Sequence, residues 1–471
     1  MVLKKHLKKT AAAALALLLA FSALPGETVL GNEIPETEIA EVNAISDPTG
    51  ISEQTEISEQ TDVSESEEAA AGVTVMFYDI GSDLEGNNMS STNDLLEIME
   101  GIYSSGIENP KVNLIVETGG MDPNFKNRNR AQVISEGRED LESTYRDFDE
   151  EKLQRYRTRY DYLTGTGTDG AGIKWNENQR FEIYSDELKP AKQQPSDPGR
   201  SMTASDDNNA VPELAEFIKT TKEDYPADQY MLIMWDHGGG PSDGFGIDER
   251  VEGMIKAWSI PTTMDEAGVD ENSAFALVNY DACLMGNLET ALVWSPYTRY
   301  YTGSEELEGG DGDYYEPWVK LLCQDAEQVD FSDGNAADQE FEEIGKEIVK
   351  DFRNWYENRE DTGTKSLIRT DKVPAVAEAL SDFAKSCSRL FELDPLTSYN
   401  GIQQMRNISQ DFYGRETGII DISDFAYNMS SDKFTDIIDT GNMEMKAATD
   451  KMKSAGSALM KAVDQAVLLH Q

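Results

Sequence analysis

The chain has 471 residues, with 41 basic and 89 acidic side chains and a formal net charge of -48. This acidic balance argues against a nucleic-acid-binding protein and would draw basic substrates toward the surface. The length is enough for a large core and a smaller second region.

The N-terminus has the pattern of a secretory signal. A lysine-rich start precedes a small apolar stretch at residues 10–24, which is followed by Pro25 and Gly26. This stretch is short for a membrane span, and no later segment approaches about 18 uninterrupted apolar residues. We therefore predict a signal peptide at residues 1–26 and an exported protein without a membrane segment, with an uncleaved anchor as the alternative.

The next segment, residues 27–72, is acidic and contains no Lys or Arg. It includes a near-repeat of Ile-Ser-Glu-Gln-Thr at residues 51–55 and 57–61. Such a segment cannot bury enough apolar surface to order itself. We predict a disordered tether or propeptide here, then a core domain at residues 73–313 and a helical C-terminal part at residues 314–471.

Hydrophobic periodicity in the core predicts strands that alternate with helices. This alternation is typical of an α/β/α sandwich with a mainly parallel central sheet. The charged stretch at residues 136–172 fits neither pattern, and we predict an insertion there. The predicted strands are 73–78, 112–117, 180–184, 230–235, 275–280 and 299–302, and the predicted helices are 93–103, 210–223, 284–294, 315–323, 338–356, 373–393 and 420–429.

Two apolar runs end abruptly in reactive side chains. The run at residues 230–235 is followed by His237 and three glycines, and the run at residues 277–280 is followed by Cys283. Open parallel sheets place their chemistry at the carboxyl ends of the strands, so we expect these side chains to meet there. The other two histidines lie at the extreme ends of the chain. A Cys/His nucleophile pair is the natural interpretation.

This pair of motifs resembles the clostripain family of cysteine peptidases, relatives of the caspases, legumains and gingipains. The resemblance is carried by His-Gly at residues 237–238 and by Asp-Ala-Cys-Leu-Met-Gly-Asn-Leu-Glu at residues 281–289. It extends upstream to the strand at 73–78, the acidic loop at 82–85 and the helix that follows. The resemblance implies a caspase-like fold and a secreted cysteine endopeptidase.

The resemblance also implies a role for each motif residue. Cys283 would attack the scissile carbonyl, His237 would manage the proton, and the amides of Gly238 and Cys283 would form the oxyanion hole, without a third catalytic residue. Because Cys283 precedes the helix predicted at residues 284–294, we expect the free amides of that helix to stabilise its thiolate.

Cleavage after arginine or lysine is a further implication of the resemblance. A carboxylate at the base of the pocket would pair with that charge. Asp281 matches the family motif, and the second candidate is Asp311, preferred over Asp313, in the Gly-rich run at residues 308–313. The alternatives for this run are a solvated acidic turn and a calcium loop.

No cofactor is required for this chemistry. Calcium stays open, because some members of the family depend on it. Zinc is disfavoured, because the aspartates near His237 are not at helical ligand spacing and the cysteines are scattered. Cys323 and Cys387 lie on helical patterns and are predicted to be small core residues, with a disulfide between them left open.

The segment between the two motifs, residues 241–274, has only Arg250 and Lys256 as basic residues. The resemblance implies self-cleavage in this interval into two chains that stay associated. We expect this cleavage to activate the enzyme, because an uncut loop could cover the cleft and block substrate. We prefer Arg250 as the site, because it follows a Gly-rich turn and nicking concentrates at exposed loop tips.

The predicted protein acts on proteins or peptides with a basic residue before the scissile bond. We expect a monomer or a self-processed two-chain form, with no nucleic-acid partner and no membrane attachment once the signal is removed. The alternatives are a catalytically idle surface binding protein on a peptidase fold and an acyltransferase with the same Cys/His pair, since the acyl-enzyme intermediate is shared.

Overall fold

The computed structural model describes residues 71–122, 129–167, 170–357, 359, 363–413, 418–438 and 441–471. The predicted signal peptide lies outside these residues, as does the predicted tether apart from its last two residues. Within the described part of the chain, no helix combines the length and the apolar character that a membrane span requires.

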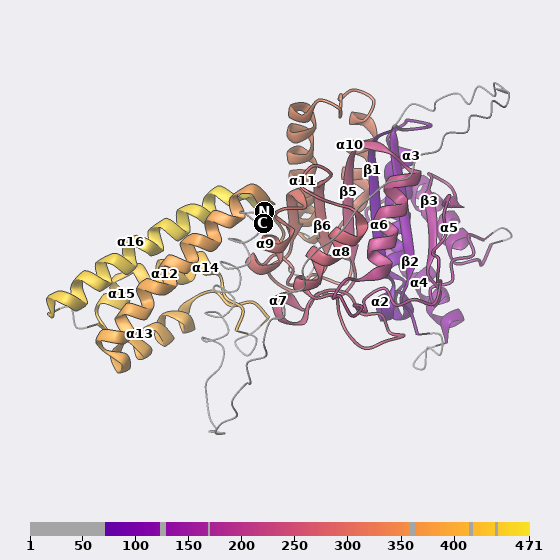
Figure 1. Cartoon of the computed structure of the whole chain (residues 1–471). Coiled ribbons are helices and arrows are strands. Elements are labelled where there is room, and N and C mark those ends of the chain that lie inside the picture. The colour runs from indigo at the N-terminus through magenta and orange to yellow at the C-terminus, as the bar shows by residue number, and fades with distance from the viewer. Residues whose placement is uncertain are drawn as a thin grey trace, which may run out of the picture.

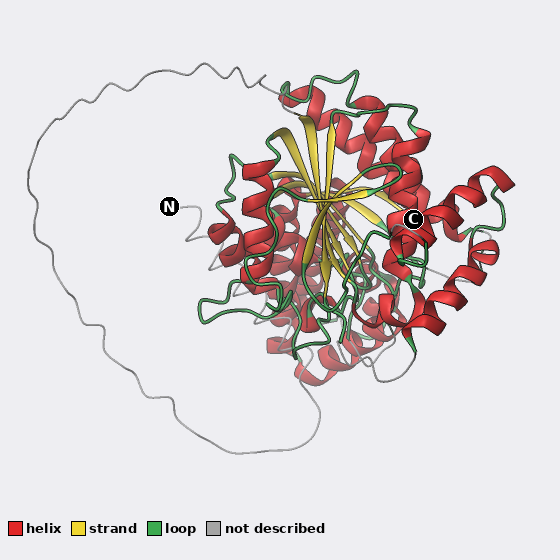
Figure 2. Cartoon of the chain, turned by 90° about the vertical axis from the view of Figure 1, so that its right-hand side faces the viewer, coloured by secondary structure: helices red, strands yellow, loops and turns green. Residues whose placement is uncertain are grey.

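One sheet runs through the molecule, with helices on both sides of it (Figure 2). It has nine strands in the order β4-β3-β2-β1-β5-β6-β7-β8-β9. The five central strands, from β2 to β7, are parallel, and the two strands at each edge are antiparallel. The central strands are covered on both faces, which explains their uninterrupted apolar sequences. The strands are β1 (Ala71–Ile80), β2 (Val112–Gly119), β3 (Gln179–Ile183), β4 (Leu188–Pro190), β5 (Ala227–Trp235), β6 (Phe275–Asp281), β7 (Thr298–Gly303), β8 (Ser366–Arg369) and β9 (Val467–His470).

Helices cover both faces of this sheet, and alternate side chains of β1 enter two different cores. Val75 and Phe77 pack with α3, α4, α5, α10 and α11, whereas Met76 and Tyr78 pack with α6, α8 and α9. The predicted α/β/α sandwich is therefore confirmed. These helices are α3 (Ser90–Ser104), α4 (Arg130–Thr144), α5 (Glu150–Leu163), α6 (Pro212–Asp224), α8 (Ile260–Ala267), α9 (Leu288–Trp294), α10 (Tyr315–Asp325) and α11 (Gly334–Tyr356), and the short α2 (Ser82–Asn88) and α7 (Gly240–Asp243) lie in loops at one end of the sheet.

The charged stretch predicted as an insertion contributes to the sandwich. It contains most of α4 and all of α5, whose Leu141, Tyr156 and Tyr160 are buried in the same core as α3. The apolar side chains are widely spaced among charged ones, so only one side of each helix faces the core.

The remaining helices form a lobe beside the sandwich (Figure 1). This helical lobe has its own buried core and is inserted between β8 and β9. The predicted division at residue 313 therefore does not separate sheet from helices, because α10, α11, β8 and β9 all belong to the sandwich. The lobe consists of α12 (Val373–Leu393), α13 (Pro395–Ile408), α14 (Ile422–Ser430), α15 (Asp432–Thr435) and α16 (Met443–Ala466).

Candidate active site

The two sequence motifs meet at the carboxyl ends of β5 and β6. These strands are parallel and in register up to Trp235 opposite Asp281, so His237 and Cys283 stand at equivalent positions just beyond them. A Cβ at Gly238 would lie 1.8 Å from the carbonyl oxygen of Cys283, so only glycine fits at this contact. The structure therefore brings the His-Gly and Asp-Ala-Cys motifs together.

The Cys283 thiol is held by the loop that follows β7. The Glu308 amide donates to the Cys283 Sγ at 3.2 Å, and the thiol lies 3.9 Å from the Glu308 carbonyl oxygen. Burial raises the pKa of the Cys283 thiol, the Glu308 amide lowers it, and the charges of Glu308 and Asp281 raise it again. The net pKa lies above that of an ordinary thiol.

The expectation that a helix stabilises the thiolate is wrong. Helix α9 begins only at Leu288, where Asn287 caps it by accepting a hydrogen bond from the Thr290 amide. Leu284, directly after the cysteine, has a left-handed φ of 63°, a conformation that a helix does not contain and that a leucine rarely adopts. The amide that contacts the sulfur comes from Glu308 instead.

His237 pairs with an aspartate that the sequence analysis did not assign. The His237 Nε2 lies 2.9 Å from Asp83 Oδ1, at the start of α2. Burial lowers the pKa of His237, but the hydrogen bond to Asp83 and the charges of Asp236, Asp83 and Glu249 outweigh it, so the pKa lies above the ordinary value. The same hydrogen bond lowers the pKa of Asp83.

Asp236 directly precedes His237 and anchors the loop that carries the histidine. It is buried, and it accepts hydrogen bonds from the Ser82 hydroxyl at 2.8 Å and from the Ile247 amide. Burial raises the pKa of Asp236 to about 7, against the opposing effect of the His237 charge. Its contacts are therefore structural, and they fix the backbone that carries His237.

Asp281 lies in a buried cluster of charges rather than on an open pocket wall. Its carboxylate accepts hydrogen bonds from the Tyr315 hydroxyl at 2.6 Å and the Asp313 amide at 3.1 Å. Carboxylate oxygens of Asp281, Glu308 and Asp313 lie within 4.8 Å of one another. The Lys365 ammonium lies among them, 2.9 Å from Glu308 Oε1 and 2.8 Å from Asp313 Oδ1.

This cluster does not fit a calcium ion. Calcium takes six to eight oxygen ligands, and here a lysine of the chain already contacts two of the three carboxylates. Asp313, the less favoured candidate for binding a substrate cation, is therefore already paired inside the protein.

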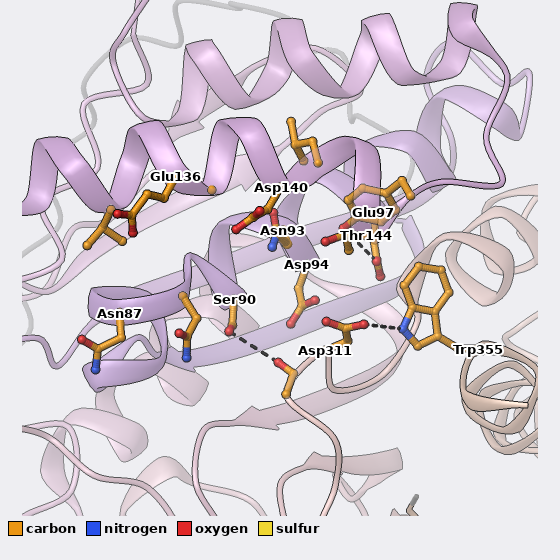
Figure 3. Close-up of a pocket in the computed structure, with 16 residues that line it drawn as sticks. Asn87, Ser90, Asn93, Asp94, Glu97, Glu136, Asp140, Thr144, Asp311 and Trp355 are labelled. Atoms are coloured by element: carbon orange, nitrogen blue, oxygen red, sulfur yellow. Dashed lines mark hydrogen bonds between the residues drawn. The ribbon is translucent and has the colours of Figure 1, made fainter. Parts of the chain in front are cut away.

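Asp311 lies on a different feature, an acidic pocket of about 300 Å³ (Figure 3). Its side chain is 42% exposed, accepts a hydrogen bond from the Trp355 indole at 3.2 Å and lies 3.7 Å from the Arg359 guanidinium. Asp94 and Glu97 of α3 and Glu136 and Asp140 of α4 also line the pocket, and no described lining residue is Lys or Arg. One loop connects this pocket to the cysteine, because Glu308 contacts Cys283 Sγ and Gly310 and Asp311 of the same loop line the pocket.

The two candidate cleavage residues differ in accessibility. The Arg250 side chain is only 11% exposed, and its guanidinium contacts Asp248 Oδ2 at 2.7 Å and Asn178 Oδ1 at 2.8 Å. Residues 251–253, directly after it, are exposed. The Lys256 ammonium donates to the carbonyl of Ser242 at 3.3 Å. The exposure expected at Arg250 is therefore found at the residues that follow it, whereas the Arg250 side chain itself is mostly buried.

The other two cysteines are buried in separate cores and are free. Burial raises the pKa of both Cys323 and Cys387 to about 12. Of the three thiols, Cys283 is the one that is partly accessible.

A partly accessible thiol and a histidine that is hydrogen-bonded to an aspartate, at adjacent parallel strand ends of a caspase-like sandwich, are typical of the class of cysteine peptidases. The family is more specific: the Clostripain family model, peptidase family C11, matches residues 78–469, and the chain belongs to this family. None of the curated proteins compared with the chain matches it.

Three solved structures to which the chain is similar come from Bacteroides thetaiotaomicron and Parabacteroides distasonis. A secreted C11 cysteine protease from Bacteroides thetaiotaomicron, "iotapain", is 11% identical with a TM-score of 0.50, over 86% of this chain and 87% of that chain. A structure of a secreted C11 cysteine protease from the same organism with an irreversible peptide inhibitor is 15% identical, with a TM-score of 0.49 over 85% and 84%. An inactive zymogen C11 protease from Parabacteroides distasonis is 16% identical, with a TM-score of 0.48 over 86% and 84%.

Proposed function

We propose that this protein is an exported cysteine endopeptidase that cleaves peptide bonds after Arg or Lys. The observation that carries the proposal is the contact of the two motif loops, where the backbone of Gly238 packs directly on that of Cys283. Export rests on the lysine-rich, apolar N-terminal sequence.

The geometry supports His237 as the residue that transfers the proton. Asp83 raises the pKa of His237, which favours the protonated ring. Burial and the charges of Glu308 and Asp281 raise the pKa of the Cys283 thiol, so the thiolate needs the positive charge of His237. The thiolate attacks the scissile carbonyl carbon, and His237 donates its proton to the leaving amine. Water then hydrolyses the thioester, which restores the thiol. The amides of Gly238 and Cys283 are assigned as the donors of hydrogen bonds to the oxyanion that develops on the scissile carbonyl.

The acidic pocket supports the preference for a basic side chain. A guanidinium or ammonium that enters it meets the exposed Asp311 carboxylate and the carboxylates of Glu136 and Asp140. Asp281 is assigned an indirect role, because both of its oxygens are engaged within the protein. It holds the turn at Gly312, where a Cβ would lie 2.8 Å from Asp281 Oδ1, and this turn directly follows Asp311.

Hydrolysis of matched peptides that end in Arg, Lys or Leu before the scissile bond tests this function. Cys283→Ala and His237→Ala should abolish hydrolysis with the fold intact, whereas Cys323→Ala should keep it. Asp311→Ala should cost roughly 2 to 5 kcal/mol in the preference for Arg over Leu, as for truncation of one member of a buried charge pair. The surface variant Asp382→Ala serves as the charge-matched control.

Two results would contradict the proposal. Full activity of Cys283→Ala would show that Cys283 is not the nucleophile. An unchanged ratio of Arg to Leu hydrolysis in Asp311→Ala would place the specificity outside the acidic pocket.

A further inference from the structure

Lys365 is a fully buried cation next to the nucleophile. It directly precedes β8, its side chain has 0% exposure, and its ammonium donates to the Tyr280 carbonyl at 2.7 Å as well as pairing with Glu308 and Asp313. Burial of a charge is costly unless it is paired and hydrogen-bonded, and here the ammonium has three oxygen partners. Burial lowers the pKa of Lys365, but the charges of Asp313, Glu308 and Asp281 outweigh it and keep the ammonium protonated.

Glu308 links this lysine to the cysteine. The Glu308 carboxylate pairs with Lys365, and the amide of the same residue donates to Cys283 Sγ at 3.2 Å. The loop that carries Glu308 also holds the cysteine turn through its backbone, since the Leu284 amide donates to the Glu306 carbonyl at 3.0 Å. Anchoring the Glu308 side chain therefore fixes the position of the donor that contacts the sulfur.

Charged groups from several elements surround the Cys283 sulfur, so the charge of Lys365 also affects the stability of the thiolate. His237 follows β5, Asp281 ends β6, and Glu308 and Asp313 belong to the loop after β7. The Tyr315 hydroxyl of α10 contacts this group through Asp281, and the Tyr356 hydroxyl of α11 donates to the Gly312 carbonyl. The carboxylates oppose a thiolate at Cys283, and Lys365 is the ammonium that balances them.

We propose that Lys365 is a positioning residue for the nucleophile, which holds Glu308 against the Cys283 sulfur and balances the carboxylates beside it. The proposal rests on the proposed function in that Cys283 is the nucleophile. It goes beyond that function by assigning a role to a residue outside both motifs, which precedes β8 and is assigned no contact with substrate.

The test uses alkylation of Cys283 by iodoacetamide as a function of pH, followed by mass spectrometry of the full chain. Loss of the balancing charge in Lys365→Met should move the midpoint of alkylation upward by about one pH unit and slow alkylation at pH 7 roughly tenfold. Lys365→Arg keeps the charge and should recover most of the rate. Lys346→Met, which removes a partly exposed lysine of α11 paired with Glu342 and Glu343, should behave as the parent protein.

Circular dichroism establishes that each variant is folded. If Lys365→Met does not fold, the double variant Lys365→Met/Asp313→Asn removes one charge of each sign, and its midpoint should still rise because Glu308 and Asp281 stay unbalanced. A folded variant of either kind with an unchanged midpoint would overturn the proposal, as would an equal shift in Lys346→Met. Since alkylation needs no peptide hydrolysis, a chain that alkylates as expected but cleaves no basic peptide would refute the proposed function and leave the role of Lys365 supported.

Discussion

Asp83 joins the site from a segment that is far from both motifs in sequence. It lies at the start of α2, directly after the carboxyl end of β1, and β1 is the neighbour of β5 in the sheet. Its carboxylate therefore reaches the same edge of the sheet as His237, at 2.9 Å from Nε2. An aspartate in this place orients the imidazole and favours its protonated form.

The pH range of this pair follows from the two pKa shifts. The lowered pKa of Asp83 means that its contribution is present above the ordinary aspartate pKa and is lost as pH falls through the folded value. The raised pKa of His237 means that its contribution is present below the ordinary histidine pKa and is lost as pH rises through the folded value. The charged pair is therefore complete between the two folded pKa values.

Asp83→Asn should lower the pKa of His237, because it removes the carboxylate charge and keeps a side chain of similar size. We expect the alkaline limb of the kcat/KM profile for an arginyl peptide to move down by about one pH unit. An NMR titration of the His237 ring gives the pKa directly, and Asp382→Asn, on the exposed face of α12, is the control. An alkaline limb that stays in place would show that Asp83 does not set the protonation of His237.

His237 and Cys283 could be identified from the sequence because each ends a buried strand, where a polar residue after a long apolar run stands out. Asp83, Glu308 and Lys365 could not, because each lies among many charged residues in a helix start or loop. The charge signs alone do not tell which carboxylate faces the histidine and which faces the lysine. Only the packing of β1, β7 and β8 around the motif strands decides this.

At the scale of the elements, the central strands were predicted well, whereas short strands near the sheet edges and several helices were missed, among them α16 with 24 residues. The central strands and α12 agree with their apolar patterns to within a few residues. The edge strands β8 and β9 were missed, since a strand of four residues is recognisable only through its neighbours. The start of the helix after Cys283 was predicted too early. The apolar sequence pattern already begins at Leu284, but the left-handed conformation of Leu284 belongs to a turn that precedes the helix.

The loop between β5 and β6 carries the proposed self-cleavage. Arg250 presents a difficulty for cleavage, since its guanidinium must leave Asp248 before it can enter a substrate pocket. Residues 251–253, directly after the bond, are exposed, and nicking concentrates at exposed loop tips. We expect slow cleavage that begins with a local opening of this ion pair.

Asp248→Asn should therefore accelerate the conversion into two chains, with a new N-terminus at Val251. Removal of the charge weakens the contact that holds Arg250, and a several-fold faster conversion on a denaturing gel is expected. Arg250→Gln should block that product, and Cys283→Ala should stay a single chain in either background. N-terminal sequencing that found Ala257 instead would assign the cut to Lys256, and an active enzyme that stays intact would contradict self-activation.

At the scale of the whole molecule, the helical lobe is an insertion between two paired strands. The chain leaves the sheet after β8, forms the five lobe helices and returns as β9, which pairs antiparallel with β8. The residue after β9 also contacts Lys365, which pairs with Glu308 beside the Cys283 sulfur. The Gln471 amide donates to the Lys365 carbonyl at 3.0 Å, and the Lys365 amide donates to the Gln471 carbonyl at 3.3 Å.

The lobe makes a second contact with the loops that carry the two motifs. The Tyr413 amide donates to the Glu306 carboxylate at 3.0 Å, and the Ile419 side chain lies 3.2 Å from the position of a Cβ at Gly240. One connection of the lobe thus touches the cysteine side and the histidine side of the site. Packing of the lobe against the sandwich therefore supports the geometry of both motif loops.

Deletion of residues 467–471 tests how far this long-range support matters. It removes the edge strand and both backbone hydrogen bonds to Lys365, so the free energy of unfolding should fall by about 2 to 4 kcal/mol, from several hydrogen bonds of about 1 kcal/mol each. Thermal unfolding gives the loss of stability, and iodoacetamide alkylation of Cys283 gives the effect at the site. His470→Ala, an exposed change that keeps the strand, is the control.

The deletion should affect the site more than the rest of the sandwich. β9 lies at the far edge of the sheet and its side chains are only partly buried, whereas Lys365 connects that edge to the loop that contacts the sulfur. We therefore expect alkylation at pH 7 to slow several-fold at temperatures where the shortened chain is still folded. Unchanged alkylation in a folded, less stable chain would show that β8 fixes Lys365 without its partner strand.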